Sequence, residues 1–429
     1  MLAALPAIGF NRSMGIRALI AIAAPLLLAA GSGEDGFFGV RALWQSARSA
    51  AAEHPVDSAA AFDRAIAASP GNNGLLLSAT GAALRAQDRE RARTLLTRFA
   101  AQGGTLPGEE VKEIGNALGA LAGDPLLAML AANGAPLDTG SVAATLPATI
   151  RLIEGVAHDD RGGSTYVSSV VDRTIYRVTG AAPAAVLRLT SDLGSPMALA
   201  IDVRHRTLWA GLDPNAPGAP ASGKGGLLKL SLDGRTHSLI TLRGTDVAIG
   251  DVMIAPDGTA YAGDGRSGAV YRCRPGCTAL ETVVVPGVLR SAQGMLLSSD
   301  GNRLYVADYA YGVAIVDPAT GTARPLRTAP GVAIDGLDGL AWRDGRIVAV
   351  QNGWQPARLI AIELDASGQR AVAARVLARA GRFSNPTQVA ATVDGVLLVV
   401  ANAQWDLYEK APAPGAVAQQ PTILLRIPR

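Results

Sequence analysis

The stretch that decides the fold reads GMLLSSDGNRLYVAD, from Gly294 to Asp308. An apolar run, an Asp-Gly pair and a second apolar run are the pattern of two antiparallel strands joined by a tight turn. Similar patterns begin at positions 155, 198, 251, 294, 339 and 388, about 43 to 53 residues apart. Most copies continue into a third strand, such as VAIVD from Val313. A four-stranded unit repeated at this period predicts the blade of a β-propeller.

We therefore predict a mainly β fold, with a six-bladed β-propeller over residues 150–429. The last apolar run, TILLRI from Thr422, has no hairpin of its own. It is expected either to complete the last blade or to pair with strands near residue 150 and close the ring, which leaves no open sheet edge. A β-sandwich or an irregular all-β domain is the alternative, and six aligned units favour the propeller.

The segment before the propeller has a helical pattern over residues 40–135. Phe62 and Leu96 lie in matching places, about 34 residues apart, which is the period of a tetratricopeptide repeat. Fewer than three such repeats rarely fold alone, so we expect these helices to pack on the propeller. A stretch rich in Gly, Pro and Ala, residues 136–149, is interpreted as the linker.

Residues 1–31 have the pattern of a signal peptide. Arg12 and Arg17 precede an apolar run that ends in small residues, and the run is shorter than the roughly 20 residues of a transmembrane helix. We predict export to the periplasm or out of the cell, with no stable membrane span after cleavage. An uncleaved membrane anchor or a buried helix is the alternative.

The net charge bears on nucleic-acid binding, and the two cysteines bear on a disulfide. The net charge is only +3 and the basic residues are scattered singly, so we expect no nucleic-acid partner. Cys273 and Cys277 flank a Pro-Gly turn. In an oxidising compartment they are expected to form a disulfide, with free thiols or a metal ion as the alternatives.

Six residues are expected to ring one mouth of the propeller channel. The first strand of each blade lines the channel, and we call the residue that precedes each repeat start the entry residue. The entry residues are Glu154, Met197, Gly250, Gln293, Asp338 and Thr387. Two carboxylates and an amide in such a ring can share a hard divalent cation, calcium before others. The alternative is that they cap strand ends or bind channel water.

Loops that follow the second strands open on the same face. Asp308 ends one of these strands, and the aromatic residues Tyr309, Trp354 and Trp405 lie just beyond strand ends. Asp or Asn at these ends indicates turn chemistry, and Asp308 is also a candidate for ligand binding. The aromatic side chains would form either a platform for a small-molecule ligand or a contact with the helical region.

Several of these stretches resemble the family of senescence marker protein, gluconolactonase and luciferin-regenerating enzyme. The resemblance covers roughly residues 150–428 and rests on Ile153-Glu154-Gly155, on the run from Ser299 to Asp308, and on Leu337-Asp338-Gly339-Leu340. It implies a six-bladed propeller that hydrolyses lactones or related esters at one divalent cation. Glu154 and Asp338 match two ligand positions of the family, and Asp338 also matches its base.

Two positions depart from the family pattern. The asparagine expected in the fourth blade is Gln293, and the Asn-Asp pair that binds substrate in the third blade is Gly250-Asp251. We predict a cation site of Glu154, Gln293 and Asp338, with Asp251 contacting the substrate. The alternative function is a propeller that binds a ligand without chemistry, or a protein partner through the helical region.

Overall fold

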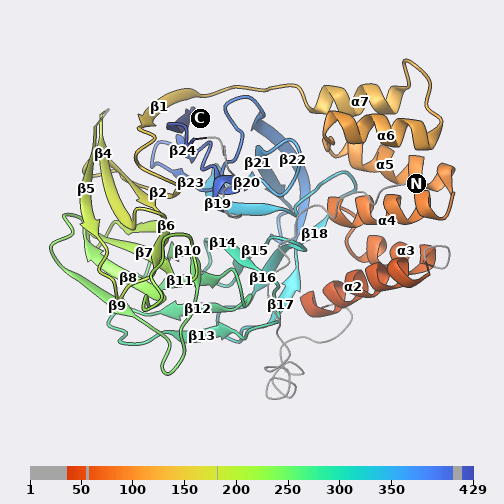
Figure 1. Cartoon of the computed structure of the whole chain (residues 1–429). Helices are drawn as coiled ribbons and strands as arrows, with labels where there is room; N and C mark the ends of the chain where they lie inside the picture. The colour runs from red at the N-terminus through yellow and green to blue at the C-terminus, as the bar shows by residue number, and fades with distance from the viewer. Residues whose placement is uncertain (1–35, 55–57, 181, 409–417) are drawn as a thin grey trace.

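The computed structural model describes residues 36–54, 58–180, 182–408 and 418–429. The predicted signal segment, residues 1–31, lies outside the described residues. Six antiparallel sheets surround a central axis, and six helices form a separate layer beside two of the sheets (Figure 1). The prediction of a six-bladed β-propeller preceded by helices is confirmed.

The first three blades follow one another along the chain, with the innermost strand first. Blade 1 comprises β2 (Ile153–Asp159), β3 (Ser164–Ser169), β4 (Thr174–Thr179) and β5 (Ala182–Arg188). Blade 2 comprises β6 (Ser195–Asp202), β7 (Thr207–Asp213), β8 (Gly226–Ser231) and β9 (His237–Ile240). Blade 3 comprises β10 (Ile249–Ile254), β11 (Ala260–Asp264), β12 (Val270–Cys273) and β13 (Glu281–Val284).

The next two blades keep the same order, and the fifth gains a strand. Blade 4 comprises β14 (Ala292–Leu297), β15 (Leu304–Asp308), β16 (Gly312–Val316) and β17 (Ala323–Pro325). Blade 5 comprises β19 (Leu337–Arg343), β20 (Arg346–Gln351), β21 (Arg358–Leu364) and β22 (Arg370–Arg379). The short strand β18 (Arg327–Thr328) pairs in parallel with β22 at its outer edge.

The last blade closes the ring with a strand from each side of the propeller sequence. It comprises β23 (Val389–Ala391), β24 (Leu397–Val400), β25 (Thr422–Ile427) and β1 (Ser141–Leu146). Strand β25 lies between β24 and β1 and pairs antiparallel with both. The stretch 136–149, which we interpreted as a linker, therefore contributes the outer strand of blade 6, and this pairing ties the two ends of the ring together.

A recurring bulge shapes the inner strands at the mouth. The pairing of each of the first five inner strands shifts at its beginning, and the shift contains the entry residue. Bulges re-aim side chains, and glycine follows the entry residue where the next blade comes close. A Cβ on Gly155 would lie 2.5 Å from the Met197 carbonyl oxygen, and one on Gly294 would lie 2.4 Å from that of Asp338. The Glu-Gly and Gln-Gly pairs thus reflect blade packing.

The helices pack beside blades 4 and 5 (Figure 1). They are α2 (Phe37–Glu53), α3 (Ala59–Ala68), α4 (Asn73–Arg85), α5 (Arg89–Ala101), α6 (Gly108–Leu118) and α7 (Pro125–Asn133). Trp44 packs edge-on against Tyr311, with ring centroids 4.9 Å apart, and Phe99 packs against Trp354 at 6.3 Å. None of the helices in the described ranges is long and apolar enough to cross a membrane.

Buried polar contacts fix this layer to the propeller. The Asp335 carboxylate accepts hydrogen bonds from the backbone N–H groups of Asn73 and Gly74, at the start of α4. The Arg358 guanidinium donates to the carbonyl oxygens of Gln102 and Gly103, just after α5. Both ends of this helical hairpin, whose terminal backbone groups lack intrahelical partners, are thus satisfied by blade 5 and the loop before it.

Candidate functional site at the channel mouth

Three buried carboxyl groups influence one another at the mouth. Glu154 comes from blade 1, Asp251 from blade 3 and Asp338 from blade 5, and their exposed fractions are 6%, 4% and 8%. The charges of Asp338 and Asp251 both raise the pKa of Glu154, and that of Asp251 raises the pKa of Asp338. Alternate blades therefore bring three acids to the axis, within electrostatic range of each other.

Burial dominates the ionisation of all three acids. Desolvation raises the pKa of Asp251 to about 7 and, together with the charge of Asp251, that of Asp338 to about 7. Desolvation is also the largest cause of the rise of the Glu154 pKa well above its usual value. No lysine or arginine in the described part of the chain offsets these shifts. Burial thus favours the protonated form of these acids, and a bound cation would favour the ionised form.

A neutral donor binds each carboxyl group. Trp405 Nε1 donates to Glu154 Oε2 over 2.5 Å, and Asn352 Nδ2 donates to Asp338 Oδ2 over 2.7 Å. In both acids the second oxygen accepts no hydrogen bond from the described residues. These two oxygens are the atoms available to a ligand at the mouth.

The third acid is held across the channel. Gln388 Nε2 donates to Asp251 Oδ2 over 2.6 Å, and this pair joins blade 6 to blade 3 on the opposite side of the ring. Both side chains are buried, with exposed fractions of 8% and 4%. Asp251, which we predicted to contact the substrate, therefore has one oxygen engaged inside the protein.

The Gln293 side chain presents an oxygen beside the gap that Gly250 leaves. Gln293 Nε2 donates to Ser291 Oγ over 2.9 Å, which fixes the orientation of the amide. Its Oε1 lies 3.9 Å from the position that a Cβ on Gly250 would take. The Gln293 side chain of blade 4 thus reaches toward blade 3, whose entry residue, Gly250, has no side chain.

These donors suit a hard cation, which prefers carboxylate and amide oxygens and keeps water ligands. Among the residues that the structure describes, no three His, Cys, Asp or Glu side chains are grouped closely enough to hold a metal ion. A cation here would use two carboxylates, Glu154 and Asp338, with Gln293. The second oxygens of the two acids and the oriented Gln293 amide fit that requirement.

Most of the residues that we predicted to bind substrate have other contacts. Asp308 is fully buried and accepts hydrogen bonds from the backbone N–H groups of Arg290, Ala310 and Tyr311, so it organises its own loop. Trp354 is buried against the helical region and donates to the Asp335 carbonyl oxygen. We therefore assign both residues a structural role.

The other two aromatic residues remain nearer the loops of the mouth. Tyr309 is half-buried, and its ring lies 3.2 Å from the position that a Cβ on Gly353 would take. Trp405 is half-buried and reaches the acids directly, through Glu154.

Sequence reasoning missed two residues of the site, Gln388 and Asn352. Gln388 occupies the repeat position that Asp251 occupies in blade 3, so the alignment contained a signal for it. Asn352 had been interpreted as turn chemistry, but its amide joins Asp338 to the Pro386 carbonyl oxygen. Asn352 Oδ1 is buried and has no partner within the described structure.

The proteins found to be similar to this chain are solved structures. No protein-family model and no curated protein sequence matches the chain. Similar solved structures include a gluconolactonase from Xanthomonas campestris, 16% identical, with a TM-score of 0.47 over 68% of this chain and 96% of its own. A luciferin-regenerating enzyme is 16% identical, with a TM-score of 0.46 over 69% of this chain and 96% of its own.

A third similar structure is regucalcin from Agrobacterium tumefaciens, described as a calcium-binding protein. It is 15% identical, with a TM-score of 0.46 over 67% of this chain and 96% of its own. At these identities and TM-scores, none of the similar structures carries an argument about this chain.

Proposed function

We propose that the mouth is the active site of a hydrolase for lactones or related esters, with a divalent cation held by Glu154, Gln293 and Asp338. The observation that carries the proposal is that three buried acids from alternate blades interact electrostatically, which raises the pKa of Glu154 and Asp338, with no basic side chain among the described residues to offset them. Buried carboxylates without a partner are costly, and proteins that retain them pair them or use them to coordinate metals. Calcium is the first candidate because all the donors are oxygen atoms.

Each residue at the mouth has its own role in the proposed hydrolysis. When bound, a divalent cation would polarise the substrate carbonyl and lower the pKa of a water molecule. Asp338 would be a ligand of the cation and the base in turn: its Oδ2 is held by Asn352, so Oδ1 is the oxygen open to both roles. Trp405 holds Glu154 in place by binding one of its oxygens.

The shape of the mouth indicates where a substrate would lie. Gly250 provides no side chain, so blade 3 leaves room beside the Gln293 amide. The Asp251–Gln388 pair crosses the channel and would form the floor under the substrate. We infer that the substrate is a small molecule that approaches from the loop side, with its carbonyl toward Glu154 and Asp338.

A non-catalytic binding propeller is the second candidate. The observation that favours it is Gly250, because it removes a side chain that the resemblance implies for substrate binding. A protein partner on the helical region and export to the periplasm also remain proposals. Binding without turnover is the result that would distinguish this candidate from the hydrolase.

Hydrolysis of a panel of five- and six-membered lactones and an aryl ester tests the proposal directly. Each is assayed with calcium, magnesium, manganese or zinc, and again after chelation. We expect turnover that chelation abolishes, and a loss of kcat of about 10² or more in Asp338→Asn. Asp394→Asn, which changes an exposed acid on another loop, should keep wild-type turnover. Absence of hydrolysis with every metal would overturn the hydrolase, and cation binding in the same protein would then favour the binding propeller.

A further inference from the structure

A second cleft lies between blades 2 and 3, on the face opposite to the mouth. Its volume is about 510 Å3. One wall is the turn between β6 and β7, and the other is the loop between β12 and β13, which carries the disulfide. Strands β6 and β10 begin at the mouth and end near this cleft, so the full length of the inner strands separates the two sites.

A lysine without a carboxylate partner lies in this cleft. The Lys229 Nζ is 5.2 Å from the centre of the Trp209 ring, and no ion pair joins Lys229 to an acid within the described ranges. Arginines elsewhere on the ring do have such partners, as Arg206 has Asp159. Lys229 therefore brings a positive charge, in no ion pair with a described residue, into a concave surface that Asp202 also lines.

A histidine beside it is held with one nitrogen free. His205 Nδ1 lies 2.7 Å from Asp202 Oδ2, and Asp202 is buried while the His205 side chain is 51% exposed. This contact fixes the ring and leaves Nε2 as the nitrogen that a ligand could meet. Arg274 also lines the cleft, although its guanidinium is paired with Glu281.

An unsatisfied donor belongs to the same wall. Trp209 is 3% exposed, and its Nε1 is buried with no acceptor in the described structure. Buried N–H groups nearly always have partners, so an orphaned one calls for an explanation.

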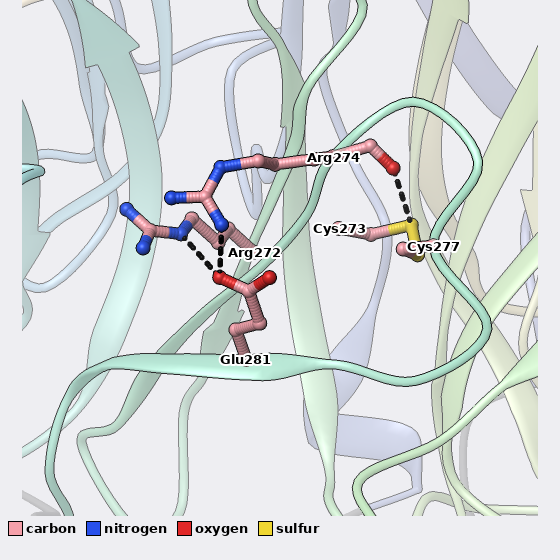
Figure 2. Close-up of a disulfide and its surroundings, with 5 residues drawn as sticks. All are labelled: Arg272, Cys273, Arg274, Cys277 and Glu281. Carbon is pink, nitrogen blue, oxygen red and sulfur yellow. Dashed lines mark hydrogen bonds and ion pairs between the residues drawn. A yellow bond between two sulfur atoms is a disulfide. The ribbon is translucent and has the colours of Figure 1, made fainter.

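The disulfide fixes the opposite wall. Cys273 is joined to Cys277, with Cα atoms 5.5 Å apart, as the Pro-Gly turn between them predicted. Figure 2 shows Arg272 and Arg274 converging on the Glu281 carboxylate beside this loop. The bridge and the shared acid hold a short loop, whose Pro275 and sulfur atoms give the cleft an apolar side.

We propose that this cleft is a second ligand site, which takes a small organic oxyanion with an apolar body. The anionic group would bind Lys229 Nζ and, where His205 is protonated, the Nε2–H of its imidazolium, and the apolar body would lie against Leu239, Pro275 and the disulfide. A charge-assisted hydrogen bond to the anion is stronger than a neutral one, so the lysine sets the preference for an anion. The site is independent of the acids at the mouth.

Calorimetric titration of the intact protein with benzoate, phenyl phosphate and inorganic phosphate tests the site, with benzamide as the neutral counterpart of benzoate. We expect saturable binding of the two aromatic anions, with benzamide and inorganic phosphate at least tenfold weaker. Whether benzoate or phenyl phosphate binds better decides between a carboxylate and a phosphate ligand.

Variants locate the binding. Lys229→Met keeps the aliphatic stem over Trp209 and removes the charge, and it should weaken benzoate binding about tenfold or more. Lys224→Met, an exposed lysine of the same blade outside the cleft, should leave the affinity unchanged. In protein with 15N-labelled tryptophan, benzoate should shift the indole signal that Trp209→Phe removes. Equal affinity in Lys229→Met, equal binding of benzamide, or no saturable binding of any aromatic anion would each overturn the proposal.

Discussion

Gln388 Nε2 donates a hydrogen bond of 2.6 Å to Asp251 Oδ2 across the channel, so two opposite blades of the ring meet through a buried amide and a buried acid. The hydrogen bond favours the ionised form of Asp251, but burial outweighs it and the pKa of Asp251 is raised to about 7. The hydrogen bond therefore links two opposite blades inside the channel, and Asp251 still titrates near neutral pH.

This raised pKa predicts how stability depends on pH. A carboxyl whose folded-state pKa exceeds its unfolded value stabilises the fold fully below the unfolded pKa, and this contribution is lost as pH rises through the folded pKa. For Asp251 the window extends from the ordinary value of 3.8 to about 7, and Asp338 titrates over the same window. With cations chelated, we expect these two acids to lower the free energy of unfolding between about pH 4 and pH 7.

The variant Asp251→Asn measures how much Asp251 contributes to the pH dependence of the free energy of unfolding. The asparagine oxygen still accepts from Gln388, but nothing ionises, so the pH dependence should flatten by about 1.4 kcal/mol for each pKa unit removed. Urea denaturation at several pH values with EDTA measures it, and Asp394→Asn is the control because its carboxylate is exposed on a hairpin. An unchanged pH profile in Asp251→Asn would show that Asp251 ionises normally.

Calcium should oppose this loss of stability. A cation that binds the folded protein alone raises the free energy of unfolding by about 2.7 kcal/mol at a hundred times its dissociation constant. We expect the thermal midpoint at pH 8 to rise with calcium concentration in the wild type and in Asp394→Asn. The rise should vanish in Asp338→Asn, which loses a charged ligand, and shrink in Gln293→Ala. An equal rise in Asp338→Asn would place the cation elsewhere.

The hydrogen bond from Trp405 to Glu154 should also contribute to stability in a pH-dependent way. The indole donor lowers the pKa of Glu154 against the effects of burial and of Asp338, so it stabilises the ionised acid. Trp405→Phe keeps an aromatic ring and removes the donor. A hydrogen bond to an ionised carboxylate is stronger than one to the neutral acid, so the loss of stability should be about 1 to 2 kcal/mol and larger at pH 8 than at pH 5.

Trp342→Phe is the matched control for that experiment. Its indole donates to the Leu297 carbonyl oxygen, so the lost hydrogen bond does not involve an ionisable group. Unfolding free energies should fall by similar amounts at both pH values in this variant. If Trp405→Phe behaved in the same way, Glu154 would not carry a charge at pH 8.

The repeats predicted the blades and the two entry acids because both are local properties of the sequence. An Asp-Gly turn between apolar runs specifies a hairpin wherever it occurs, and six hairpins in register place Glu154 and Asp338 at equivalent ends. The disulfide was foreseeable for the same reason, since Cys273 and Cys277 are joined across one turn.

Contacts between distant parts of the chain could not be predicted in this way. The Asp251–Gln388 pair depends on which blades face each other and on the bulge that turns Asp251 toward the axis. Trp354 and Trp405 occupy similar places after their strands, yet one packs on a helix and the other binds Glu154. What surrounds each loop decides this, and the repeat pattern does not encode those surroundings.

The attachment of the helices supplies the last prediction. Arg358 is 4% exposed, and it donates to the Gln351 side chain and to two carbonyl oxygens at the end of α5. Its charge also lies near Asp335, which binds the start of α4. Arg358→Met would leave these buried acceptors unsatisfied and Asp335 uncompensated. We expect a loss of about 3 to 5 kcal/mol and faster proteolysis of the segment between α7 and β1.

Arg382→Met is the control, because Arg382 binds Asp138 in the same region while both side chains are at least one-third exposed. An exposed pair is worth at most about 1 kcal/mol, so this variant should unfold almost as the wild type does. Chemical denaturation and limited proteolysis of both variants measure the difference. If Arg358→Met lost no more stability than Arg382→Met, the buried guanidinium would not be what holds the helices, and the aromatic contacts of Trp44 and Phe99 would have to carry the attachment.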